Sequence, residues 1–128
     1  MAKRATHSDF RKGGFVSLWL GNKLTGEEEL DGYLAERFQS DFGFVIYPPD
    51  GPEYDVSETP KCIDDLLDGF SRSTTFKEAA VEAANLMGWA EATTAVVFYN
   101  FKYDSDNDNA TESSPLRFVG VFRFPGFS

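Results

Sequence analysis

The stretch from Phe15 to Leu34 constrains the fold more than any other part of the chain, because it holds a strand, a turn and a helix start in direct succession. Its first part, Phe15–Leu20, is almost wholly apolar and contains aromatic residues, which is typical of a strand covered on both faces. A Gly-Asn pair breaks this run. Thr25 then lies three residues before Glu28, and this spacing predicts a capping box at the start of a helix. The apolar stripe of that helix is expected to be Leu30, Tyr33, Leu34 and Phe38.

Three later segments have the composition of strands. Phe42–Tyr47 is a short run of aromatic and β-branched residues that two prolines bring to an end. Thr94–Tyr103 shows the clearest strand pattern in the chain, and Leu116–Phe124 follows it after a polar loop. We expect these last two strands to pair with each other as an antiparallel hairpin.

Hydroxyl residues mark two further helix starts. Thr59 precedes Pro60, which suits an N-cap followed by the first helical position and predicts a short helix there. Thr75 and Glu78 repeat the capping-box spacing in front of an alanine-rich helix, Phe76–Met87. The buried line of this second helix is expected to be Phe76, Ala80, Ala83 and Met87.

The length of the chain and the order of its elements predict one domain of the α+β class. With 128 residues, the chain can form a single core without disulfide bonds. We expect a flexible tail at residues 1–14 and one domain at residues 15–128. The domain is predicted to be a small mixed β-sheet with about three helices packed mainly on one face. Its core is expected to include Trp19, Leu30, Leu34, Phe76, Phe98, Phe101, Phe118 and Phe122.

The chain is acidic, with 21 acidic against 12 basic side chains and a formal net charge of −9. Nucleic acids and anionic membranes bind through cationic side chains, so neither is an expected partner. An acidic surface speeds association with a basic protein, although the same charge also serves solubility alone. No apolar stretch has membrane-spanning length and no secretory signal is present, so a cytoplasmic protein is expected.

Side chains suited to catalysis or to zinc binding are scarce. His7 is the single histidine and lies in the expected tail, where it is a poor partner for a nucleophile. Cys62 is the single cysteine, so the chain has no internal disulfide and lacks the ligands of an ordinary zinc site. Carboxylates are abundant, but no two of them stand out as an acid–base pair. We therefore predict a protein that is not an enzyme and that uses no cofactor.

Asp104, Asp106 and Asp108 alternate as at the start of a calcium-binding loop. Asn109 occupies the position where such a loop needs glycine, and Pro115 the position where it needs a bidentate glutamate. A solvated hairpin tip is the preferred interpretation, and weak calcium binding stays open.

A second acidic stretch begins after the prolines at positions 48 and 49. Its carboxylates surround Tyr54, an aromatic residue of the kind that carries binding energy at interfaces, and its prolines reduce the entropy lost on binding. Two interpretations stay open, a solvated charged loop and a docking surface on a rigid scaffold. The residues of this candidate docking surface are Asp50, Glu53, Tyr54, Asp55, Glu58, Asp64, Asp65 and Asp68.

Several segments also resemble a known family. Val16–Asn22, followed by the acidic helix, is similar to the opening of the bacterial immunity proteins numbered twenty-two, a family found beside polymorphic toxins. The similarity continues at Leu66–Ser71, Ala95–Tyr103 and Phe118–Phe122, in the same order. It covers most of the chain from position 15 to position 124, whereas residues 47–60 lie outside it.

The resemblance implies a protein that binds a cognate toxin domain and neutralises it by steric and electrostatic occlusion. A basic toxin domain is expected from the charge of this chain, and a nuclease fits because its substrate groove must be basic. The candidate docking surface would then be the toxin-binding surface. A small carboxylate-based metal-binding protein or enzyme, and a general protein-interaction module, are the alternatives. The sequence leaves the oligomeric state open.

Overall fold

The computed structural model describes residues 5–6, 10–24, 26–45, 52–70 and 73–123. Its main sheet has four strands in the order β4-β5-β2-β6, and all neighbours in it are antiparallel. Strands β2 and β5 are therefore central, and β4 and β6 are the edges. The strands of this sheet are β2 (Arg11–Gly21), β4 (Glu53–Cys62), β5 (Glu91–Phe101) and β6 (Arg117–Arg123).

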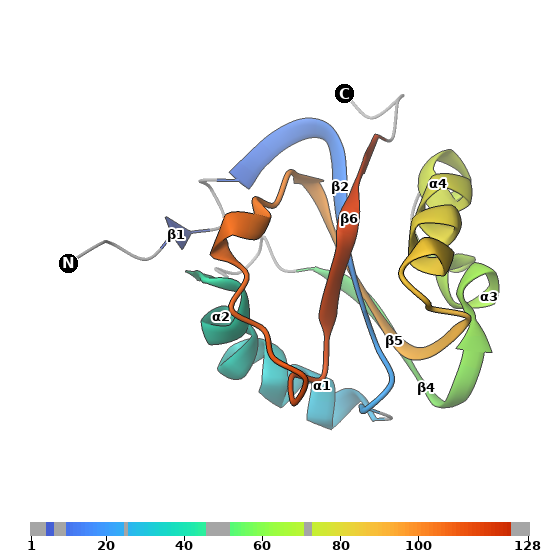
Figure 1. The fold of residues 1–128 in the computed structure, drawn as a ribbon, viewed down its shortest axis with the longest axis horizontal. Coiled ribbons are helices and arrows are strands. Elements are labelled where there is room, and N and C mark those ends of the chain that lie inside the picture. Colours follow the sequence, from blue (N-terminus) through green and yellow to red (C-terminus); the bar gives the residue numbers. More distant parts are fainter. Residues whose placement is uncertain (1–4, 7–9, 25, 46–51, 71–72, 124–128) are drawn as a thin grey trace.

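Two pairs of helices cover opposite faces of this sheet, one pair to its left and one to its right in Figure 1. The left pair is α1 (Glu27–Ala35) and α2 (Arg37–Phe42), and the right pair is α3 (Ile63–Leu67) and α4 (Ser73–Leu86). The described residues also form two short parallel strands, β1 (Ala5–Thr6) and β3 (Phe44–Val45), and a 3-10 turn, η2 (Ser105–Asn107).

Alternate residues of the central strands enter two separate cores. Leu18 of β2 and Val97 of β5 are register partners that pack with α3 and α4. Trp19 and Val96, the next partners along, pack with α1 and α2. Because each face of these strands meets a helix pair, both strands are apolar along most of their length. This explains the near-continuous apolar run that begins the domain.

The core beside α1 and α2 is an aromatic cluster around Trp19. Ring centroids of its neighbours lie between 5.0 Å, for Phe118, and 6.5 Å, for Phe101, from the centroid of Trp19. Most of these ring pairs are tilted or edge-on, the arrangements that aromatic quadrupoles favour. The Trp19 Nε1–H group is buried and has no hydrogen-bond acceptor among the described residues.

The structure buries most of the residues that were predicted for the core. Phe118 and Phe122 of β6 are only partly buried, because β6 is an edge strand. The buried members are Trp19, Leu30, Leu34, Phe76, Phe98 and Phe101.

The α+β class is confirmed, but three details of the predicted architecture are wrong. The four-stranded sheet is antiparallel throughout, and the described parallel pairing is confined to β1 and β3. Helices cover both faces, since a strand buried on both sides needs cover on both sides. The last two strands, β5 and β6, are not a hairpin, because β2 lies between them. The apolar β2 occupies the centre of the sheet, and the polar residues 102–116 cross over it to reach the far edge.

Two helix starts also differ from the prediction. Thr59 and Pro60 belong to the edge strand β4, where a residue without an N–H group is tolerated, and Cys62 is instead the N-cap of α3. Helix α4 begins at Ser73, so Thr75 lies inside it and does not cap it. For α1 the N-cap is Gly26, and the predicted capping residue Thr25 lies outside the described residues.

The segment predicted as the strand Phe42–Tyr47 begins with the end of a helix and contains only a short strand. Phe42 ends α2, and Gly43 caps that helix with a φ of 75°, in the left-handed region that favours glycine. A Cβ atom at Gly43 would lie 2.6 Å from the carbonyl oxygen of Asn107, so the loop after β5 also requires glycine here. Only Phe44–Val45 is a strand, and residues 46–47 lie outside the described part.

The segment predicted as a tail contains two described stretches of strand. β1 pairs with β3, and β2 begins at Arg11, the register partner of Phe101. The register then shifts before Val16, which is the partner of Tyr99. At this irregularity the Gly14 N–H donates to Asn100 Oδ1 over 3.3 Å.

The buried indole of Trp19 leads to a prediction about stability. Trp19→Ala should lower the free energy of unfolding by about 3–5 kcal/mol, because it opens a cavity in the aromatic core. Trp19→Phe should cost less than about half of that, because it keeps one ring and removes the unpartnered N–H group. Denaturant unfolding of both variants checks this, and equal losses for the two would contradict it.

The tyrosines lead to a prediction about alkaline pH. Burial raises the pKa of Tyr33, Tyr99 and Tyr103, and for Tyr33 the hydrogen bond to Asp41 adds to this. The folded chain therefore keeps protons that the unfolded chain loses near the ordinary pKa of about 10. Stability should be fully present below pH 10 and should fall as the pH rises further.

Tyrosinate absorbance and far-ultraviolet circular dichroism, followed together against pH, test this prediction. The buried tyrosines should ionise only as the fold is lost. Tyrosines that all ionise near pH 10 in a chain with native circular dichroism would refute it. Tyr33→Phe is the direct variant, because it removes one of the phenols whose pKa is raised and should weaken the dependence of stability on alkaline pH.

Candidate functional site

The candidate docking surface lies along β4 and α3, at one edge of the sheet. Among the described strands, β4 pairs only with β5. Along this strand, Glu53 and Asp55 are the register partners of Val97 and Ala95, so their side chains stand on the α3–α4 side of the sheet. Asp50, the first residue of the predicted surface, lies outside the described residues.

Successive side chains of a strand point to opposite faces of the sheet, so Tyr54 is separated from the carboxylates of Glu53 and Asp55. It stands on the opposite side of the sheet, where it packs partly against the aromatic core. Its hydroxyl donates a hydrogen bond to the carboxylate of Asp31 on α1. This hydrogen bond, together with partial burial, raises the pKa of Tyr54 to about 12. Tyr54 therefore ties the edge strand to α1, which is a different role from the free aromatic anchor that the sequence suggested.

The middle of β4 leaves the regular ladder. Val56 is the partner of Thr94 and Lys61 is the partner of Ala92. An advance of five residues along β4 therefore corresponds to an advance of only two residues along β5. The extra residues form a bulge that carries the exposed Glu58 and also Pro60. Bulges and prolines both protect an edge strand from indiscriminate pairing with other strands.

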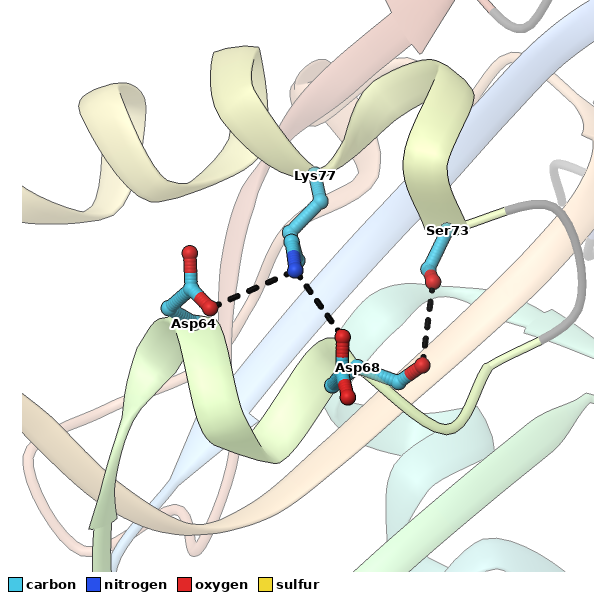
Figure 2. Close-up of polar contacts among 4 residues, drawn as sticks. All are labelled: Asp64, Asp68, Ser73 and Lys77. Atoms are coloured by element: carbon cyan, nitrogen blue, oxygen red, sulfur yellow. Dashed lines mark hydrogen bonds and ion pairs between the residues drawn. The ribbon is translucent and has the colours of Figure 1, made fainter.

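Asp64 and Asp68 lie on the side of α3 that faces α4, where Lys77 of α4 holds both carboxylates (Figure 2). Lys77 Nζ lies 3.3 Å from Asp64 Oδ1 and 3.0 Å from Asp68 Oδ1. The Ser73 hydroxyl donates to the Asp68 carbonyl oxygen over 3.2 Å. Hydrogen bonds to the carboxylates of Asp68 and Asp64 raise the pKa of Lys77 above its ordinary value.

Sequence reasoning missed Lys77. Lys77 lies outside the acidic stretch in the sequence, yet it makes the described ion pairs of α3. Asp64 and Asp68 are four residues apart, so they share one side of a helix, and this spacing was a usable signal for a shared cation. Asp65 is also exposed and makes none of the described ion pairs.

Positive side chains gather at the other end of the sheet. The ring of Phe15 has Lys102 Nζ at 5.2 Å, Arg123 Cζ at 5.6 Å and Lys12 Nζ at 5.8 Å from its centroid. Phe15 is the register partner of Arg123, whereas the junction of β4 and α3 is at the opposite end, where Cys62 pairs with Glu91. The basic cluster therefore lies at the end of the sheet away from the junction of β4 and α3.

The loop after β5 uses its carboxylates to shape turns. Asp104 Oδ1 accepts from the Asp106 N–H over 2.9 Å, and Asp108 Oδ1 accepts from the Ala110 N–H over 2.8 Å. No group of three or more metal-ligating side chains occurs among the described residues. A groove of about 450 Å³ beside the loop contains one carboxylate, Asp104, and one cation, Lys102.

In the part of the chain that the structure describes, no helix combines the length and the apolar character needed to cross a membrane. The single cysteine, Cys62, is exposed at the start of α3 and is free. The described side chains on the β4–α3 side offer charge and shape for binding. They do not form a constellation with evident acid–base or nucleophilic chemistry.

Comparison with known proteins found no matching curated protein and no matching solved structure. A family model described as Immunity protein 22 matches residues 16–125, from β2 to the end of β6. The match spans most of the chain and confirms the family that the sequence resembled. The chain therefore belongs to the Immunity protein 22 family.

Proposed function

We propose that this chain binds a cognate toxin domain and neutralises it by covering its active site or substrate path. The family match is the observation that carries this proposal. No bond is made or broken, so inhibition depends only on how long and how tightly the two proteins stay together.

The charges support a basic partner. The β4–α3 acidic surface, defined here as Glu53, Asp55, Glu58, Asp64, Asp65 and Asp68, belongs to a chain with a net charge of −9. Basic substrate grooves are typical of nucleases, because these enzymes must bind a polyanion. An acidic protein surface fits such a groove electrostatically and speeds encounter. A nuclease toxin is therefore the partner class that we favour.

The rigidity of this surface supports occlusion. β4 is tied to α1 through Tyr54 and Asp31, and α3 is tied to α4 through Lys77. A surface that is already ordered loses little conformational entropy when it binds. Tyr54 would then contribute indirectly, by holding the edge strand that carries the carboxylates.

Charge reversal tests the location of the surface. The triple variant Asp55→Lys, Glu58→Lys and Asp65→Lys leaves both partners of Lys77 in place. It should slow association with the toxin domain encoded by the neighbouring gene on the order of tenfold or more at low salt. The difference from the unmodified chain should shrink as salt is added.

A matched control changes the total charge equally at exposed sites elsewhere. Glu36→Lys, Asp106→Lys and Glu112→Lys lie near α2 and in the loop between β5 and β6. This control should bind with nearly the unmodified rate constant, apart from the effect of net charge. Equal slowing of both triple variants would show that only net charge matters and would remove the assignment to β4 and α3. Failure of the unmodified chain to bind the toxin domain, or to rescue growth on co-expression, would overturn the proposed function.

A further inference from the structure

Two large apolar side chains stand in solvent at the end of α4. Leu86 is 84% exposed and Met87 is 51% exposed, and they are the exposed large hydrophobic residues of the described part of the chain. Sequence periodicity placed Met87 in the buried line of the helix, which is wrong. The helix ends at Leu86, and the chain then turns, so that position 87 no longer continues the buried stripe.

This exposure belongs to a well-defined turn. The Met87 N–H donates to the Ala83 carbonyl oxygen over 3.2 Å, and the Trp89 N–H donates to the Ala84 carbonyl oxygen over 2.9 Å. Gly88 supplies the positive φ of 93° that such a helix end requires. Trp89 packs partly against the core beside α3 and α4. The backbone that holds the two apolar side chains outward is therefore anchored on both sides.

The surroundings of the pair are acidic. Glu78 and Glu82 lie eight and four residues before Leu86, on the same exposed line of the helix and opposite the buried Ala80 and Ala84. The chain then enters β5 at the exposed Glu91. An apolar centre with a charged rim is the usual anatomy of a protein interface.

The chain also leads from the pair to the end of β4. Glu91 is the register partner of Cys62, the residue at which β4 ends and α3 begins. The turn at the end of α4 therefore leads to the same corner of the molecule as the β4–α3 acidic surface. One partner of moderate size could contact both.

We propose that Leu86 and Met87 form the apolar centre of the toxin-binding surface, and that the toxin covers them with an apolar patch bordered by lysine or arginine. This inference rests on the proposed function. Charge complementarity identifies the occupant, since Glu82 and Glu91 favour a basic rim on the partner. A symmetric dimer of this chain would instead bring the same carboxylates of both copies close together, which is unfavourable.

The double variant Leu86→Ser and Met87→Ser tests the inference. Because both side chains are exposed, the variant should unfold at nearly the unmodified denaturant concentration. Binding to an inactivated toxin domain should weaken at least tenfold, mainly through faster dissociation and with little dependence on salt. The matched control Leu86→Met and Met87→Leu keeps the apolar area and should bind almost as the unmodified chain does.

The outcomes separate this inference from the proposed function. If the unmodified chain binds the toxin and the serine variant dissociates equally slowly, the apolar centre is elsewhere and the inference fails alone. If the unmodified chain is a dimer by sedimentation and the serine variant is a monomer, a second copy occupies the pair and the inference is overturned. If the unmodified chain does not bind the toxin at all, both proposals fail.

Discussion

Strands β2 and β5 have no face open to solvent along most of their length, and this burial organises the rest of the fold. Each face needs its own cover, so α1 with α2 and α3 with α4 pack on opposite sides. The two most buried strands occupy the centre, and the less buried β4 and β6 are left at the edges. Trp19 and its aromatic neighbours fill one side of this arrangement, which makes that core dense and rigid.

The same constraint decides where a partner can be bound. The buried middle of the central strands offers no surface, so charge is displayed at their ends, on the edge strand β4, on α3 and on the outer line of α4. Tyr54 with Asp31, and Lys77 with Asp64 and Asp68, link these outer elements to their neighbours. A preformed surface of this kind suits an inhibitor that acts by binding alone, because little is left to order in the complex.

Local patterns in the sequence predicted several elements well. The strand from Phe15, the helix carrying Leu30 and Leu34, and the strand after Thr94 exist close to their predicted positions. The spacing of apolar residues and the placement of glycines are local properties of the sequence, so they predict the same elements that the folded chain contains. The order of strands is not local. Insertion of β2 between β5 and β6 depends on which strands bury the most apolar surface together, and a pairwise hairpin rule cannot anticipate it.

The candidate site was predictable to a smaller extent. The carboxylates of β4 and α3 were found, because runs of charge are visible in sequence. The separation of Tyr54 from Glu53 and Asp55 was not predicted. It arises because side chains alternate between the two faces of a strand, and the sequence favoured a loop or a docking surface in this segment. Thr59 and Pro60 fit both a helix start and a bulged edge strand, and the pairing of Lys61 with Ala92 selects the strand. Lys77 reaches α3 only through the packing of two helices.

We propose that a toxin covers the part of the molecule that runs from β4 through α3 to the end of α4. Amide hydrogen exchange of the chain, alone and in complex with the inactivated toxin domain, measures this most directly. We expect slower exchange in the complex at residues 53–70 and 82–91, with no change at residues 102–116. Protection confined to residues 102–116, or to the basic cluster around Phe15, would contradict it.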